Sequence, residues 1–246
     1  MDTVTPPTGV SGREPSPVRM VVMRERPHWH AAGAVLVAIL LYISLPESLT
    51  IGQNWYLPVL EAALLPPLLV ATDARCRQGS LWQRLLFLGF CDQSRFQRAG
   101  ILLLIGVINA ANVGSLVLLS QGVLNGSIKS GSTLVLSAIQ IWLTNVIVFG
   151  LWYWQLDRGG PASRALHPHR SPDFLFPQAA SPEAAPPGWR PGFVDYLYVA
   201  YTNVTAFSPT DTMPLTGWAK LLMAIQAMTA LITAVLVLSR AVNILM

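Results

Sequence analysis

Three uninterrupted apolar runs constrain this chain more than any other feature. They cover residues 101–124, 134–154 and 218–238. Each has about the 20 residues that an α-helix needs to cross the ~30 Å hydrocarbon core of a bilayer. Because a backbone in lipid must satisfy its own hydrogen bonds, such runs must be helical. The sequence therefore predicts an all-α, polytopic membrane protein.

Three shorter apolar segments, at 31–45, 55–71 and 193–207, accompany these runs. They bring the expected number of transmembrane segments to five or six, depending on whether 193–207 crosses the membrane. The composition agrees, because 52% of the residues are hydrophobic and only 11% are charged. Globular domains carry roughly 25% charged residues. Most of the exterior is therefore expected to face lipid.

The remaining segments suggest how the chain is divided. The N-terminal tail has few apolar residues, so we expect it to be disordered. The short apolar segment at 81–90 cannot span, and we expect it to lie amphipathically in the membrane interface. The expected units are a tail at 1–27, a four-segment transmembrane bundle at 28–156 that includes the interfacial segment, a proline-rich loop at 157–192 without a helical pattern, and a C-terminal unit at 193–246.

The basic residues predict the orientation. Of the 16 lysines and arginines, four precede the first apolar segment, five lie in 73–98 and four in the proline-rich loop. One lies in the turn at 125–133. Lysine and arginine accumulate in cytoplasmic loops, so we expect a multi-pass protein of the cell membrane with a cytoplasmic N-terminus. Cys76 and Cys91 fall in the second basic segment and lack zinc-site spacing, so we expect free cytoplasmic thiols.

The C-terminal unit places an aromatic segment at 193–207 before a polar stretch at 208–216 and the long apolar run that begins at Trp218. The same order is found in the pore module of potassium channels, where an aromatic pore helix ends in a Thr-Thr-Val-Gly-Tyr-Gly-Asp filter, followed by a Pro-Val-Thr stretch and a long inner helix. Pro214 and Thr216 match the Pro-Val-Thr stretch, and Trp218 with Lys220 matches the start of the inner helix. The filter positions are occupied, without a gap, by Thr205, Ala206, Phe207, Ser208, Pro209, Thr210 and Asp211. The segment therefore resembles a potassium-channel pore module, which implies ion conduction by a tetramer.

A second resemblance covers the whole C-terminal half. It includes the sequence DFLFP at 173–177 and DYLY at 195–198. This half is similar to the DUF1345 family of bacterial membrane proteins, whose function is unknown. That resemblance implies a membrane fold and no particular activity.

The filter-like turn departs from the potassium-channel pattern. Ser208 and Thr210 replace glycines whose backbone conformations other residues resist, and Pro209 restricts its own φ and the residue before it. We therefore expect an opening lined by hydroxyl groups and Asp211, with poor discrimination between monovalent cations. Alternatively, 193–207 crosses the membrane and 208–214 is an exposed loop, with Asp211 or Thr212 capping the next helix.

The orientation adds a second choice. A potassium-channel pore loop enters the membrane from outside, whereas the basic residues place the preceding loop inside. Either the module is inverted, as in ionotropic glutamate receptors, or 193–207 is a sixth span.

Several polar residues inside apolar runs are candidates for transport. Glu61 is an acidic group within a hydrophobic run, which suggests function because burial of its charge is costly. Asn109 and Asn112 could line a polar path, or they could form hydrogen bonds across the hairpin to Gln140 and Asn145. Gln226 would face a pore in a channel and a neighbouring helix otherwise.

These features favour a homo-oligomeric ion-channel-like protein, a tetramer by analogy, that passes monovalent cations and has the lipid bilayer as its partner. The alternatives are a small proton- or ion-coupled transporter that uses Glu61 and an accessory membrane protein that does not conduct. No nucleotide-binding, metalloprotease or serine-hydrolase motif occurs in the sequence, so we expect no enzyme, cofactor, metal site or nucleic-acid partner.

Overall fold

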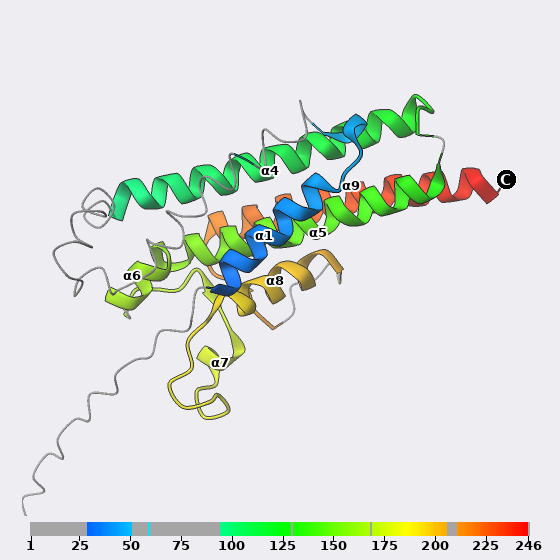
Figure 1. Ribbon diagram of the computed structural model, residues 1–246. Coiled ribbons are helices and arrows are strands. Elements are labelled where there is room, and N and C mark those ends of the chain that lie inside the picture. The colour runs from blue at the N-terminus through cyan, green and yellow to red at the C-terminus, as the bar shows by residue number, and fades with distance from the viewer. Residues whose placement is uncertain are drawn as a thin grey trace, which may run out of the picture.

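The computed structural model describes residues 29–50, 59, 94–128, 130–167, 169–205 and 211–245. Four helices form its main body (Figure 1), namely α1 (Trp29–Ile43), α4 (Ser94–Leu124), α5 (Gly131–Leu156) and α9 (Gly217–Leu245). Three stretches, Arg98–Leu124, Gly131–Gly159 and Gly217–Ser239, are long and apolar enough to cross a membrane. The helix over His30–Ile43 is apolar but shorter.

The predicted helical class is confirmed, and α1, α4, α5, α9 and the short helix at Phe193–Thr205 occupy five of the six expected apolar segments. Other predictions fall outside the described residues. These are the disordered tail at 1–27, the apolar segment at 55–71 apart from residue 59, the interfacial segment at 81–90 and the two cysteine thiols.

Helices α4 and α5 form the expected antiparallel hairpin, closed by a short turn. Gly126 adopts a positive φ of 65° in this turn, a conformation that glycine reaches without steric strain. The hydroxyl of Ser130 then accepts a hydrogen bond from the Thr133 amide and caps the start of α5. Leu119 and Ile141 are fully buried in the apolar cluster that includes both helices.

The helix ends divide into two groups. Gln140 of α5 donates a 2.8 Å hydrogen bond to the Ser44 hydroxyl just after α1, so α1 runs antiparallel to α5. Figure 1 shows that α1, α4, α8 (Phe193–Thr205) and α9 begin near one end of the bundle, where α5 finishes. We call this the basic end, because it carries Arg98 and the four arginines of the proline-rich loop, Arg158, Arg164, Arg170 and Arg190.

The proline-rich loop contains more local structure than the sequence predicts. It includes the 3-10 helix η3 (Asp157–Gly159) and the short helices α6 (Pro161–Leu166) and α7 (Pro177–Ala180). Proline stands at the start of both α6 and α7, where its fixed φ favours a helix and its missing N–H is not needed. The expectation of a loop without helices was therefore wrong.

A two-stranded pairing connects this loop to the start of α9. Strand β1 (Phe174–Leu175) pairs antiparallel with β2 (Met213–Pro214). Phe174 is fully buried, and its ring lies 5.0 Å from that of Tyr153, 6.3 Å from Tyr196 and 6.1 Å from Trp218. One loop side chain thus packs against α5, α8 and α9 at once.

Much of the outer surface of the long helices is apolar. Large hydrophobic side chains are exposed on α1, α4, α5 and α9, among them Leu40, Leu103, Leu136, Leu221 and Leu238. A water-facing helix would place polar residues on such a face. This surface is suited to lipid or to other membrane helices.

Candidate functional site

The C-terminal unit centres on the short helix α8. The helix begins with Phe193, whose ring lies 5.9 Å from Trp154 at the basic end. The Gly192 amide donates a 2.6 Å hydrogen bond to the Asp195 carboxylate and closes the first turn. The 13 residues of α8 extend only ~20 Å at 1.5 Å per residue.

Helices α8 and α9 lie side by side and run in the same direction. Near the end of α8, the Asn203 amide donates to the Met223 carbonyl and to Oε1 of Gln226, both at 2.9 Å. Gln226 lies nine residues after Gly217, the first residue of α9, or ~14 Å along the helix axis. The chain is back at the basic end by Met213, where β2 pairs with β1.

A buried polar network joins α8 and α9 to α5. Gln226 is fully buried, and its Oε1 also accepts a 2.6 Å hydrogen bond from the Tyr153 hydroxyl. Its Nε2 donates to the Ala200 carbonyl at 2.9 Å. Tyr153 belongs to α5, whereas Asn203 and Ala200 both belong to α8, so the network fixes how far α8 extends along α9.

At the basic end, α8 is anchored by the buried carboxylate of Asp157. The Tyr196 hydroxyl donates to its Oδ2 at 2.6 Å, and the Asp173 amide donates to its Oδ1 at 2.8 Å. The Arg158 and Arg164 guanidinium groups lie 3.8 and 4.0 Å from Oδ2. Asp157 thereby connects the end of α5 to β1 and α8.

Asp173 extends this anchor to α9. Its Oδ1 accepts a 3.0 Å hydrogen bond from the Trp218 indole N–H, and its Oδ2 accepts a 2.8 Å bond from the Arg158 amide. Arg158 has a φ of 51°, a left-handed conformation that is uncommon for residues other than glycine. The bond to Asp173 stabilises that conformation.

Ionisation at this anchor depends on burial. Burial lowers the pKa of the Arg164 guanidinium, and the nearby Tyr196 and Asp157 oppose that change. Burial raises the pKa of Tyr196 well above its ordinary value, so the phenol stays protonated and donates to Asp157. The Arg164 guanidinium carbon lies 5.2 Å from the centre of the Tyr196 ring, within cation–π distance.

The structure describes only two of the filter-like residues named from the sequence. Thr205 is exposed at the end of α8, where its hydroxyl bonds to the Tyr201 carbonyl at 2.9 Å. Asp211 is exposed on the way back to β2. Phe207, Ser208, Pro209 and Thr210 lie outside the described residues, as does the transport candidate Glu61.

The other transport candidates are divided between this unit and α4. Gln226 contacts α5 and α8, the neighbouring-helix position that the sequence left open for it. Asn112 is buried on α4 and Asn109 is half-buried one turn earlier. Of these three candidates, Gln226 contacts α8, whereas Asn109 and Asn112 belong to α4.

The hydrogen bonds expected across the hairpin are not present in the described part of the chain. Gln140 bonds to Ser44 instead. Several buried side-chain atoms of α4 and α5 have no hydrogen-bond partner there, namely Asn109 Oδ1, Asn112 Nδ2, Ser115 Oγ, Ser137 Oγ and both polar atoms of Asn145. The interpretation of these residues as interhelical hydrogen-bonding pairs was wrong.

Sequence reasoning did not identify Asp157, Tyr153 or Tyr196 as parts of a site. Asp157 had one available signal, because it is a carboxylate directly after a run of 20 mainly apolar residues. Such a group at a membrane boundary must find partners. The identity of those partners depends on contacts between distant segments.

Comparisons with protein-family models, with curated proteins and with solved structures find no match to this chain.

Proposed function

We propose that this chain is an integral membrane protein that assembles as a homo-oligomer and forms a poorly selective cation pathway at its C-terminal unit. The main support for the proposal is the path of the chain through α8. Helix α8 runs beside α9 as far as Gln226, and the chain is back at the basic end by Met213. This is the course of a re-entrant helix followed by a spanning helix.

The dimensions support a re-entrant helix over a sixth span. Gln226 lies ~14 Å along α9, close to half of the ~30 Å hydrocarbon core. Asn203 bonds to it, so the end of α8 lies near mid-membrane if α9 spans. Because Met213 is back at the basic end, we propose that the chain turns back after Thr205. Backbone that is not helical at such a depth requires protein or water to satisfy its polar groups, which supports a water-filled opening.

The orientation follows from the basic end. All four arginines of the proline-rich loop and Arg98 lie there, and such residues accumulate on the cytoplasmic side. We therefore propose that α8 enters from the cytoplasm, which is the inverted arrangement of a potassium-channel module. The N-terminal end of α1 lies on the same side (Figure 1).

The residues of the reversal determine the expected selectivity. Ser208, Pro209 and Thr210 stand where a potassium filter has its alternating glycines and aromatic residue. Hydroxyl groups and the exposed Asp211 would hold partly hydrated cations, whereas a potassium filter removes their water with successive carbonyls. The pathway should therefore pass potassium and sodium with little discrimination.

Recordings from the purified full-length protein in planar bilayers test this proposal. We expect a cation conductance that separates potassium and sodium poorly under bi-ionic conditions. Asp211→Asn should reduce it, because one acidic group per subunit is lost from the opening. Glu183→Gln removes the same charge from an exposed position in the loop and should leave it unchanged. A potassium preference as strong as that of a true potassium channel would contradict the proposal.

One observation favours a second candidate, a proton- or ion-coupled transporter. The polar atoms of α4 and α5 that are buried without partners in the described part of the chain could contact water or a carboxylate on a transport path. Asn109, Asn112 and Ser115 lie along one side of α4 at intervals of three residues. Glu61→Gln should then abolish proton-coupled uptake into proteoliposomes, whereas in the channel the conductance would persist.

A further inference from the structure

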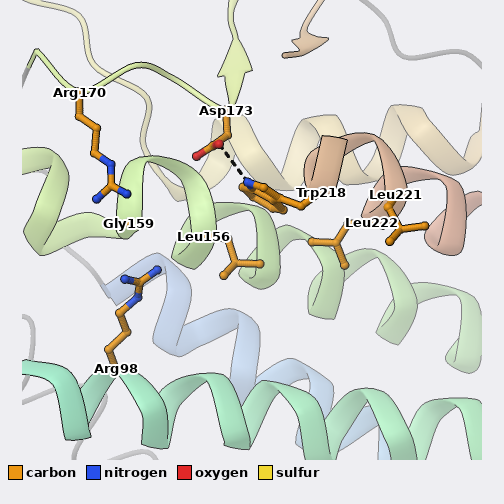
Figure 2. A pocket seen from close by; sticks show the side chains of 8 residues that line it. All are labelled: Arg98, Leu156, Gly159, Arg170, Asp173, Trp218, Leu221 and Leu222. Atoms are coloured by element: carbon orange, nitrogen blue, oxygen red, sulfur yellow. Dashed lines mark hydrogen bonds between the residues drawn. The ribbon is translucent and has the colours of Figure 1, made fainter. Parts of the chain in front are cut away.

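A cluster of residues that lines a cavity lies at the basic end, separate from the proposed ion pathway after α8. An open cavity of about 480 Å³ lies between the start of α4, the end of α5 and the start of α9, and Figure 2 shows the side chains that line it. This is within the range of ~300–1,000 Å³ typical of small-molecule sites. Its lining residues are Arg98, Leu156, Gly159, Arg170, Asp173, Trp218, Leu221 and Leu222.

Two guanidinium groups in this cavity lack a carboxylate partner within the described residues. Arg98 is half-buried, and its Nε is buried with no hydrogen-bond partner there. Arg170 is exposed and has one long hydrogen bond, 3.4 Å, to the Ser163 hydroxyl. In Figure 2 they approach Gly159 from opposite sides. Two such groups with unused donors form a natural site for a phosphate.

The backbone at this point allows both arginines to approach. Gly159 and Gly160 have positive φ values of 83° and 98°. A Cβ on Gly159 would lie 2.6 Å from Nη1 of Arg170, and one on Gly160 would lie 3.9 Å from Nε of Arg98. A side chain at 159 would therefore require Arg170 to shift, and the positive φ at this position is strained for residues other than glycine.

The acidic residue in the lining, Asp173, forms no ion pair with either arginine within the described residues, so the three charged groups of the lining leave a net positive charge. Asp173 accepts hydrogen bonds from the Trp218 indole and from the Arg158 amide, one at each carboxylate oxygen. Both carboxylate oxygens therefore already accept hydrogen bonds that join α9 and η3 to β1.

The α9 side of the cavity is apolar and continues along the outer surface of the helix. Leu221 lines the cavity and is 61% exposed. It begins a stripe of exposed apolar residues at alternating spacings of four and three, namely Leu221, Ile225, Met228, Ile232 and Val235. The 14-residue interval from first to last measures ~21 Å, which exceeds the ~15 Å depth of one membrane leaflet. A soluble phosphate has no apolar chain that could contact this stripe.

We propose that this cavity binds an anionic phospholipid, with its phosphate between Arg98 and Arg170 and an acyl chain along the α9 stripe. Basic pockets between transmembrane helices at the cytoplasmic side suit anionic headgroups. The site would hold the start of α4 close to the start of α9, and it does not depend on whether the protein conducts ions.

The test measures thermal unfolding of the full-length protein in neutral detergent as phosphatidylglycerol is added, which gives an apparent Kd. Arg98→Gln and Arg170→Gln should each raise that Kd by about tenfold or more, since each loses a charge-assisted hydrogen bond. Arg190→Gln removes the same charge from an exposed position at the basic end outside the cavity and should change it less than twofold. Gel filtration verifies that each variant is folded.

Three further probes identify the source of the phosphate. Phosphatidylcholine should bind more weakly than phosphatidylglycerol, and the deacylated headgroup glycerophosphoglycerol should bind roughly a hundredfold more weakly or not at all, because it lacks the acyl chains. Inorganic phosphate should produce no comparable shift. Equal stabilisation by both lipids, an equal effect of Arg190→Gln, or stabilisation by inorganic phosphate alone at the same concentration would each overturn the proposal.

Discussion

The hydroxyl of Tyr196 donates a 2.6 Å hydrogen bond to the buried carboxylate of Asp157, and this single contact joins the first turn of α8 to the end of α5. Together with the network around Gln226, it sets both ends of α8. The helix is therefore positioned by polar contacts at its start and near its finish, with apolar packing between them.

The first prediction concerns that contact. Tyr196→Phe removes a donor from a buried carboxylate and should lower the free energy of unfolding by about 1–3 kcal/mol. Tyr198→Phe on the same helix is a matched control, because Tyr198 is 59% exposed and surface changes are usually within about 0.5 kcal/mol. Thermal or denaturant unfolding in detergent measures both. Equal effects of the two substitutions would show that the bond to Asp157 contributes nothing.

The second prediction concerns the network between α5, α8 and α9. Gln226→Leu leaves the buried Tyr153 hydroxyl without its acceptor, so we expect a loss of about 1–3 kcal/mol. The double variant Gln226→Leu with Tyr153→Phe should lose less than the sum of the two single variants, because they break the same bond. Thr229→Val, one turn further along α9, serves as the control, since its hydroxyl bonds only to the carbonyl of Ile225 in its own helix.

The sequence was sufficient to predict the long helices but not their polar contacts. The runs at 101–124, 134–154 and 218–238 specify helices by themselves, because a backbone in lipid has few other ways to satisfy its hydrogen bonds. The pairings of Asp157 with Tyr196 and of Asn203 with Gln226 join segments 39 and 23 residues apart. No local pattern encodes such distances.

The loop shows the same limit in another form. Its prolines indicated an irregular segment without helices, and this prediction missed the short helices α6 and α7. No pattern in the loop predicted that Phe174 would be buried among three aromatic rings, because aromatic residues in a proline-rich segment can equally face solvent. The pairing of β1 with β2 holds Phe174 beside the start of α9 and so determines that its ring is buried.

The third prediction concerns the unpaired polar atoms of α4 and α5. If Asn112 has no role beyond the fold, Asn112→Leu removes a buried amide nitrogen that has no hydrogen-bond partner in the described part of the chain and should leave stability unchanged or raise it. If it contacts water on a transport path, the same change should reduce flux while stability is kept. Measuring unfolding and proteoliposome flux on one preparation separates the two, with Val113→Leu at the neighbouring exposed position as a control for introducing leucine on this helix.

The fourth prediction concerns orientation. In a background of Cys76→Ser and Cys91→Ser, single cysteines are introduced by Glu183→Cys and Asn125→Cys, both at exposed positions. The first lies in the loop at the basic end and the second in the hairpin turn at the other end. An impermeant thiol reagent applied to intact cells should label the cysteine at 125 and spare the one at 183. The reverse pattern would contradict the proposed cytoplasmic basic end.

The last prediction distinguishes a re-entrant α8 from a sixth span, on which the proposed ion pathway depends. The chain returns to the basic end at β2, two residues after the exposed Asp211. In the same cysteine-free background, Asp211→Cys should therefore be protected from the impermeant reagent in intact cells and become labelled in inside-out vesicles, as the cysteine at 183 is. If α8 instead crossed the membrane, residue 211 would emerge on the opposite side and share the labelling of the cysteine at 125. Lys220→Cys, on the first turns of α9 and also exposed, is an internal check, because it should follow residue 211 in either case. Labelling of 211 together with 125 would remove the re-entrant helix and, with it, the proposed pathway.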